Sequence, residues 1–330
     1  MGNDVTPLIG RTLADNVTAE EIQLERKRLL SEFKLRPVSV FDSNKKTSGR
    51  KDVIGCEDED GRRVILRIGE RRPEYFFPDG LVSKILRVPR QFHFGGTRIP
   101  FEIEEWIEGQ KAWELERELA RPGQISPMMR DTLIAVFWEF QRVMESLPLE
   151  QLFTIEKVRA FAEQAGELLP SKAKSLIEEQ ETFWNDPYPA KWKFSTDNLI
   201  LDPQGRVTLI DNVKVGGRYF GYDLGFLIWP RWVEVGSLEG AALEEHLAYL
   251  DAFKQSWIVA APSDVRQPKD LDRAFTLMLF ERLVGSLYDV QRQVSHFAQW
   301  GMLGDEGAGK RAAHAAFLQR LLSIVMERLR

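Results

Sequence analysis

The period of the hydrophobic pattern changes once along this chain, at about residue 123. Before that point, segments in which apolar and polar residues alternate predict β-strands at 36–41, 51–69 and 100–109. After it, apolar residues recur every three or four positions, which predicts a helix over 127–147. Further helical patterns cover 154–182, 239–259, 270–298 and 310–329. A β-rich first third followed by helices favours a two-lobed α+β fold.

Two helices are predicted within the β-rich third. The segment 18–33 begins with Thr18, a good N-cap residue, and carries acidic residues in its first turn. The segment 79–89, "DGLVSKILRVP", is predicted to form a short helix that stops before Pro89.

One β island interrupts the helical part, at 198–211. Its sequence, "NLILDPQGRVTLID", predicts two strands joined by a Pro-Gln-Gly turn. An antiparallel pair brings Asn198 and Asp211 close together, and amide and carboxylate oxygens are ligands that Mg²⁺ prefers. The alternative is that both residues only cap strands and turns, where Asn and Asp are common.

The segment around this hairpin resembles the catalytic region of the aminoglycoside phosphotransferase family, within the wider protein-kinase-like fold. In that fold a catalytic-loop Asn is followed thirteen residues later by the Asp that binds Mg²⁺, as Asn198 is followed by Asp211 here. "FGYDLGFLIW", at 220–229, resembles the family's Tyr-Asp-Leu helix start. By that resemblance, Asp223 is a structural carboxylate that braces the catalytic loop.

The first third shows the same resemblance in the correct order. "RRVILRIG" resembles the strand that carries the phosphate-contacting basic residue, which would be Arg67. "FEIEEWIEG" resembles the strand that leads into the hinge, where main-chain groups of Glu105, Trp106 and Ile107 would meet adenine. The segment 41–50 would form the phosphate-covering loop.

The resemblance implies a division into lobes. Residues 1–104 would form the N-terminal lobe, 105–110 the hinge, and 111–330 a helical C-terminal lobe that contains the hairpin 198–211. A cleft is expected at the hinge. A kinase also needs an acid to anchor its basic residue, and Glu70 and Glu74 are the better candidates, although both can equally be solvated surface acids.

The chain departs from the family pattern at the catalytic base. The family reads His-Gly-Asp, then four residues, then Asn, and the Asp orients the substrate hydroxyl. Counting back from Asn198 places Lys193 at the position of this Asp and Lys191 at that of the His. A charged lysine cannot accept a proton, although it can pair with a γ-phosphate.

Three functions therefore stay open. The leading hypothesis is an ATP- and Mg²⁺-dependent phosphotransferase that acts on the hydroxyl of a small-molecule acceptor. The second is a nucleotide-binding pseudokinase that acts as a scaffold or regulator. The third is a nucleotidyl transferase in which Asp197 replaces the base, because Thr-Asp-Asn at 196–198 resembles the same triplet in selenoprotein O, a kinase-like enzyme that transfers AMP.

Composition argues against other classes of protein. The net charge of −5 gives no basic field for nucleic acid or for an anionic membrane surface. No apolar run reaches the roughly 20 residues that span a bilayer. Cys56 is the only cysteine, which fits a reducing compartment. A cytoplasmic protein without nucleic-acid or membrane partners is expected.

Overall fold

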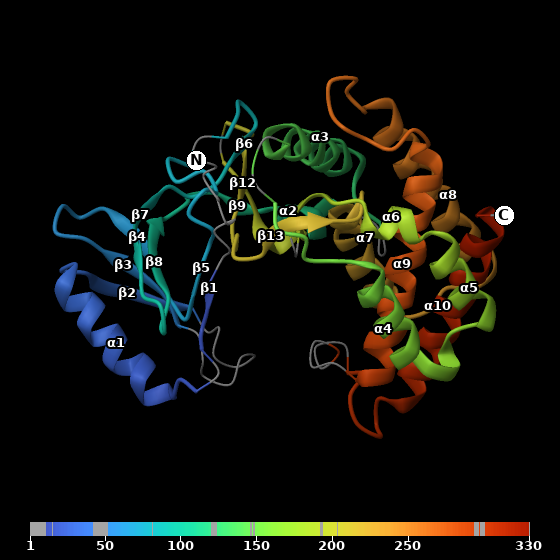
Figure 1. The fold of residues 1–330 in the computed structure, drawn as a ribbon, viewed down its shortest axis with the longest axis horizontal. Coiled ribbons are helices and arrows are strands. Elements are labelled where there is room, and N and C mark those ends of the chain that lie inside the picture. The colour runs from blue at the N-terminus through green and yellow to red at the C-terminus, as the bar shows by residue number, and fades with distance from the viewer. Residues whose placement is uncertain are drawn as a thin grey trace, which may run out of the picture. The chain divides into compact units, whose positions relative to one another are not determined.

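The chain is a mixed α+β protein that divides into two compact units (Figure 1). The first unit contains residues 1–111 and 197–215, and the second contains 112–196 and 216–330. The computed structural model describes residues 11–14, 16–41, 52–80, 82–119, 124–145, 147, 149–191, 194–202, 204–293, 297 and 301–329.

A five-stranded antiparallel sheet forms the centre of the first unit, with the strand order β2-β3-β4-β8-β7. Four of its strands, β2, β3, β4 and β8, confirm those predicted from the alternating pattern, whereas β7 was not predicted. Their bounds are β2 Arg36–Phe41, β3 Asp52–Glu57, β4 Arg63–Ile68, β8 Phe101–Glu105 and β7 Gln91–Gly95. A separate two-stranded antiparallel sheet is formed by β1, Arg11–Thr12, and β5, Glu70–Arg71.

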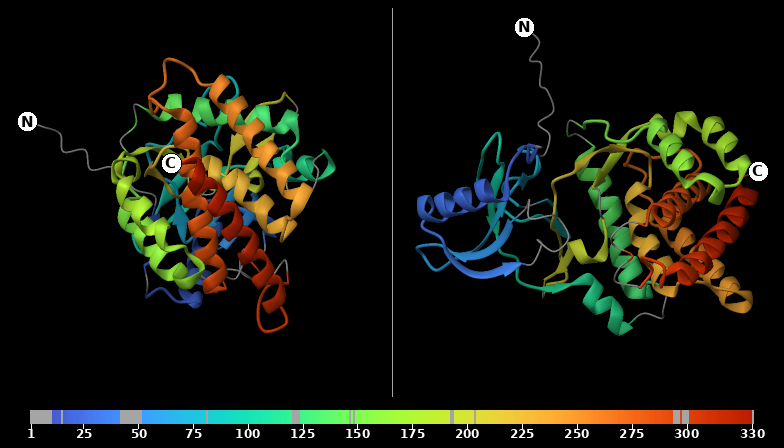
Figure 2. Two further views of the ribbon diagram at one scale, coloured as in Figure 1. Left: turned by 90° about the vertical axis from the view of Figure 1, so that its right-hand side faces the viewer. Right: turned by 90° about the horizontal axis from the view of Figure 1, so that it is seen from below.

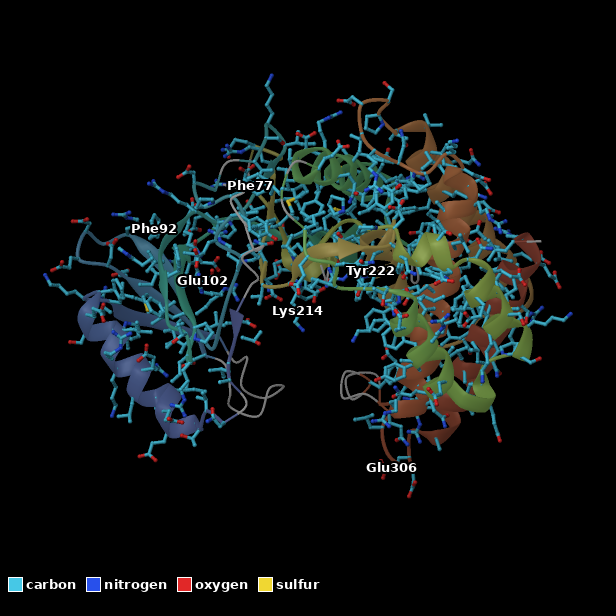
Figure 3. The ribbon with its side chains drawn as sticks, viewed as in Figure 1. Phe77, Phe92, Glu102, Lys214, Tyr222 and Glu306 are labelled. Carbon is cyan, nitrogen blue, oxygen red and sulfur yellow. The ribbon has the colours of Figure 1, made fainter. Side chains whose placement is uncertain are left out.

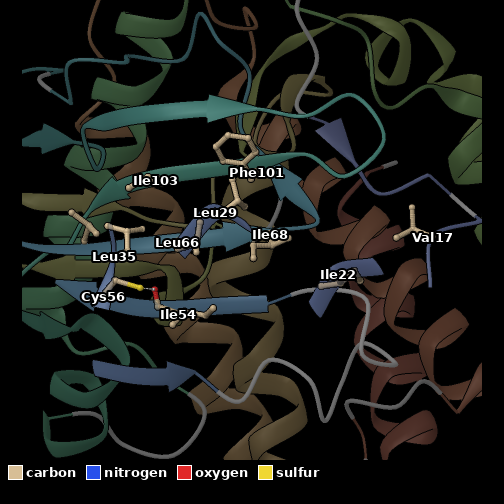
Figure 4. Close-up of a cluster of buried hydrophobic side chains, with 11 residues drawn as sticks. Val17, Ile22, Leu29, Leu35, Ile54, Cys56, Leu66, Ile68, Phe101 and Ile103 are labelled. Atoms are coloured by element: carbon tan, nitrogen blue, oxygen red, sulfur yellow. Dashed lines mark hydrogen bonds between the residues drawn. The ribbon is translucent and has the colours of Figure 1, made fainter. Parts of the chain in front are cut away.

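Helix α1, Ala19–Glu32, begins where the sequence predicts. The Thr18 hydroxyl accepts a hydrogen bond from the Glu21 N–H at 3.2 Å, and the Glu21 carboxylate accepts one from the Thr18 N–H at 2.8 Å. This capping box satisfies main-chain donors that the first turn would otherwise leave unpaired. The helix packs on one face of the sheet and closes a hydrophobic core (Figure 4) that includes Ile22, Leu29, Ile54, Cys56, Val64, Leu66, Ile68, Phe101 and Ile103.

The helix predicted at 79–89 is wrong. Residues Leu86–Arg87 form strand β6, which pairs in parallel with β12, Val207–Leu209. Gly80 has a φ of 80°, and its carbonyl accepts a hydrogen bond from the Val88 N–H at 3.0 Å, which folds the segment back on itself. Leu86 and Val88 are buried on either side of Arg87, so the period here is two.

The predicted hairpin is confirmed as β11, Leu199–Leu201, and β12. It forms a four-stranded sheet in the order β6-β12-β11-β9, in which β9 is Gln110–Lys111. The hairpin therefore belongs to the compact first unit, although residues 112–196 of the second unit precede it in the sequence.

The second unit is mainly helical, as predicted (Figure 2). The helical pattern predicted at 154–182 does not form one continuous helix, because Gly166, with a φ of 59°, and Pro170 separate α4 from α5. No helix among the described residues is long and apolar enough to cross a membrane. The elements are α2 Ala112–Leu119, α3 Pro127–Met144, α4 Ile155–Ala165, α5 Ser171–Glu179, α6 Glu181–Asn185, α7 Tyr222–Val235, α8 Gly240–Val259, α9 Leu271–Arg292 and α10 Ala308–Arg328, with strands β10 Tyr188–Lys191 and β13 Val215–Arg218.

Candidate nucleotide and metal site

The hairpin brings Asn198 and Asp211 to the same end of one strand pair. Leu199 lies opposite Leu209 in the register, and the Ile210 N–H donates a hydrogen bond to the Asn198 carbonyl at 3.0 Å. Asp211 is the next residue after this bond. The two oxygen-bearing side chains thus leave the main chain at neighbouring positions, as a site for a hard cation requires.

The backbone of Asp211 is held in an unusual conformation. Its φ is 60°, in the left-handed region that residues other than glycine seldom adopt. The following residue supports this turn, because the Asn212 amide donates to the Leu209 carbonyl at 2.9 Å. A strained backbone of this kind is concentrated at functional sites, where it directs a side chain that ordinary geometry would turn elsewhere.

Arg67 projects from β4 on the sheet face opposite α1. Its Nε lies 2.6 Å from Oε1 of Glu104 and 3.7 Å from Oε1 of Glu102, both on the neighbouring strand β8. Burial lowers the pKa of Arg67, but the carboxylates of Glu104, Asp211 and Glu102 outweigh it and raise this pKa. The attraction to Asp211 shows that the hairpin end and Arg67 share one region of the first unit.

The anchor of Arg67 differs from the predicted one. Glu74 pairs with Arg71 at 2.6 Å, and Glu70 approaches Arg67 only to 4.0 Å. The described residues of the segment 79–89 form no helix that could supply an acid, so β8 supplies it. The signal was present in the sequence: in "FEIEE" the acids alternate with Phe101 and Ile103, so Glu102 and Glu104 share the face that the core does not use.

Glu102, labelled in Figure 3, is a buried acid of β8, and the guanidinium groups of Arg67 and Arg72 lie 3.7 and 4.0 Å from its carboxylate oxygens. Its Oε2 accepts hydrogen bonds from the Arg72 N–H at 3.2 Å and from the Gln91 amide at 3.0 Å. Burial, with the nearby carboxylate of Glu104, raises the pKa of Glu102 to about 7, against the pull of Arg67 and Arg72. The folded protein therefore keeps this carboxyl protonated to a higher pH than an exposed glutamate.

Replacing Glu102 with glutamine should reduce the loss of stability as the pH rises from 5 to 8. The pKa rises on folding from 4.5 to about 7, so the folded state binds more protons in this window and stability falls as pH rises through it. Between pH 5 and pH 8, the free energy of unfolding should fall by about 2 kcal/mol less in Glu102→Gln than in the wild type. Urea unfolding at each pH measures this free energy.

The matched control is Glu105→Gln, at the half-buried end of the same strand. The buried histidines His246 and His314 affect all three proteins equally, so only the differences between proteins matter. If the free energy of unfolding fell equally with pH in Glu102→Gln and in the wild type, Glu102 would not be the group whose pKa rises on folding.

The predicted adenine-binding residues follow the end of β8. The Glu105 N–H donates to the Arg90 carbonyl at 2.8 Å, and its carboxylate binds Arg87 at 2.7 and 2.8 Å. Trp106 and Ile107 are half-buried. Glu105 and Trp106 line a cavity of ≈ 500 Å³ in the first unit. The contact of these three residues with a base stays a prediction.

The loop before the hairpin forms a turn at the predicted base. Thr196–Asn198 is a 3₁₀ turn, and Asp197 within it is exposed. Asp197 therefore need not point away from Asn198, as it would in an extended strand. Lys193 and residues 42–50 of the predicted phosphate-covering loop lie outside the described residues.

Asp223 is placed as the resemblance implies. It lies in the first turn of α7, buried, and its Oδ2 accepts a hydrogen bond from the Lys191 N–H at 2.7 Å. Lys191 ends β10 and is itself buried. Within the second unit, Asp223 thus fixes the main chain at the start of the loop.

Solved structures share this arrangement of elements. A candidate aminoglycoside phosphotransferase from Ralstonia eutropha superposes with a TM-score of 0.56 at 14% identity, covering 90% of this chain and 98% of that one. The chain has the fold of the aminoglycoside phosphotransferase-like kinases. This confirms the fold expected from the resemblance of the hairpin region.

Two further kinases share this phosphotransferase fold. Amicoumacin kinase, in complex with AMP-PNP and Ca²⁺, has a TM-score of 0.53 at 12% identity and covers 91% of this chain and 93% of that one. A microcompartment-associated aminopropanol kinase has a TM-score of 0.51 at 15% identity and covers 93% and 99%. No protein-family model and no curated protein matches the sequence.

Proposed function

We propose that this protein is an ATP- and Mg²⁺-dependent phosphotransferase that acts on the hydroxyl of a small molecule. The observation that supports this most is the grouping of Asn198 and Asp211 at one hairpin end with the buried guanidinium of Arg67. Proteins of similar fold are small-molecule kinases, and one of them was solved with AMP-PNP and Ca²⁺. Its partners would be a nucleotide and a small-molecule acceptor, in the cytoplasm.

Each group would have a separate role. The Asn198 amide oxygen and the Asp211 carboxylate would hold Mg²⁺, which supplies charge neutralisation for phosphate oxygens. Arg67 would clamp the phosphates with the donors that Glu104 does not use. Because Glu104 already orients the guanidinium, little side-chain entropy is lost when it binds phosphate.

The proton acceptor is the part on which the alternatives differ. Asp197 lies in an exposed turn directly before Asn198, so it would orient the attacking hydroxyl or, in adenylyl transfer, the acceptor of AMP. If Asp197 has neither role, Lys193 at the base position favours the pseudokinase, a nucleotide-binding scaffold or regulator.

ATP with Mg²⁺ should raise the melting temperature of the protein. A ligand that binds only the folded state stabilises it by about 2.7 kcal/mol at one hundred times its dissociation constant. Differential scanning fluorimetry measures the shift, and ATP with EDTA serves as the metal-free control. The absence of any shift at millimolar ATP-Mg²⁺ would reject both transferase hypotheses and the nucleotide-binding pseudokinase.

A further inference from the structure

The side chain of Trp106 lies on the sheet face that also bears Arg67. A Cβ added to Gly55 of β3 would lie 2.5 Å from Cζ3 and 3.4 Å from Cε3 of Trp106. Gly55 pairs with Ile65, two residues before Arg67 on β4, and faces away from the core that α1 covers. The absence of a side chain at Gly55 therefore makes room for the indole against the strand.

Arg63 holds the indole in this place. Its guanidinium lies 3.9 Å from the centroid of the Trp106 ring, a cation–π contact. The same guanidinium binds Glu108 at 3.0 Å, two residues further along the chain. The edge of the indole thus lies against Gly55 of β3, and the guanidinium of Arg63 covers the face of its ring.

This place coincides with the base end of the proposed nucleotide site. Arg63 and Arg67 share one face of β4 and are four residues apart, roughly 13 Å at the usual rise of a strand. Glu105 pairs with Val64, so the main chain that would meet the base begins level with Arg63. A nucleotide with its phosphates at Arg67 must place its base on the surface that the indole covers.

We propose that Trp106 closes the base end of the nucleotide site and that a bound nucleotide displaces its indole. The inference rests on the proposed function. The cavity of ≈ 500 Å³ beside Trp106 gives the displaced ring space, and Arg87 and Arg90 in its wall offer a second cation for the ring. Inorganic phosphates do not reach the indole. Displacing the indole therefore weakens the binding only of ligands that carry a base.

The test compares ATP with inorganic tripolyphosphate, each with Mg²⁺, by isothermal titration calorimetry. In Trp106→Ala we expect ATP to bind about tenfold more tightly, because its base no longer has to displace an indole. Tripolyphosphate should bind wild type and Trp106→Ala equally. Gly55→Ala should act in the same direction, since its Cβ would lie 2.5 Å from the indole. The same Cβ would lie 2.3 Å from Oγ of Ser39, so this variant is made together with Ser39→Ala and compared with Ser39→Ala alone.

Phe33→Ala is the matched control. Phe33 is likewise a partly buried aromatic residue of the first unit, but it packs against the core on the α1 side, with its ring centroid 4.7 Å from that of His93, and it does not line the cavity. It should leave the affinity for both ligands unchanged. Weaker or unchanged ATP binding in Trp106→Ala, with tripolyphosphate still bound, would overturn this inference alone. Failure of every variant to bind either ligand would overturn the proposed function and this inference with it.

Discussion

Asp211→Asn should abolish the effect of Mg²⁺ on nucleotide binding and lower turnover by about 10³-fold. Asparagine adopts the left-handed backbone at least as readily as aspartate, so the φ of 60° at this position is retained. Only the charge is lost. Arg67 remains bound to Glu104, so metal-free ATP should still bind weakly. Calorimetry with and without Mg²⁺ measures the difference directly.

Asp202→Asn is the control for this experiment. It changes the same residue type in the same hairpin, at the opposite end, where Asp202 accepts hydrogen bonds from the Gln204 and Arg206 N–H groups at 2.9 Å. It should affect stability and not the metal dependence. Equal Mg²⁺ dependence in Asp211→Asn and wild type would show that this residue is not a metal ligand.

Asp197→Asn should lower turnover by about 10²–10⁴-fold while nucleotide affinity stays nearly unchanged, as for the loss of a general base. The exposed turn at 196–198 supports this separation, because the carboxylate is not needed for packing. Asp202→Asn, in the turn at the other end of the hairpin, again provides the control. ATP labelled at the γ-phosphate or at the α-phosphate, tested in parallel, distinguishes phosphoryl from adenylyl transfer.

Two results would reject this role of Asp197. Unchanged turnover in Asp197→Asn would mean that another group orients the acceptor. A wild-type protein that binds ATP-Mg²⁺ and transfers neither label to a panel of small hydroxyl compounds would favour the pseudokinase with Lys193 in place of the base.

Local patterns predicted those parts of the fold that local interactions determine. The capping box at Thr18 depends on residues three apart, and the β11–β12 hairpin depends on one short turn. The same hairpin register places Asn198 opposite Ile210, and therefore next to Asp211. In each case the partners are so close in sequence that the spacing alone fixes their geometry.

Contacts between distant segments could not be predicted in this way. The pairing of Arg67 with Glu104 follows from the neighbouring positions of β4 and β8, which no local pattern states. The segment 79–89 has enough apolar residues for a helix, but pairing with β12, far along the chain, favours a strand. The contact of Trp106 with Gly55 likewise depends on how the chain returns past β3.

The discontinuous make-up of the first unit has a consequence for biosynthesis. Strands β6 and β9 have their hydrogen-bonding partners on the hairpin, which the ribosome adds only after residue 196. During translation the edges of β6 and β9 stay unpaired while α2 to α6 of the second unit are synthesised. The nascent chain therefore cannot finish its units one after the other, and the order of folding in the cell is interleaved, with two strand edges left open to mispairing until the hairpin arrives.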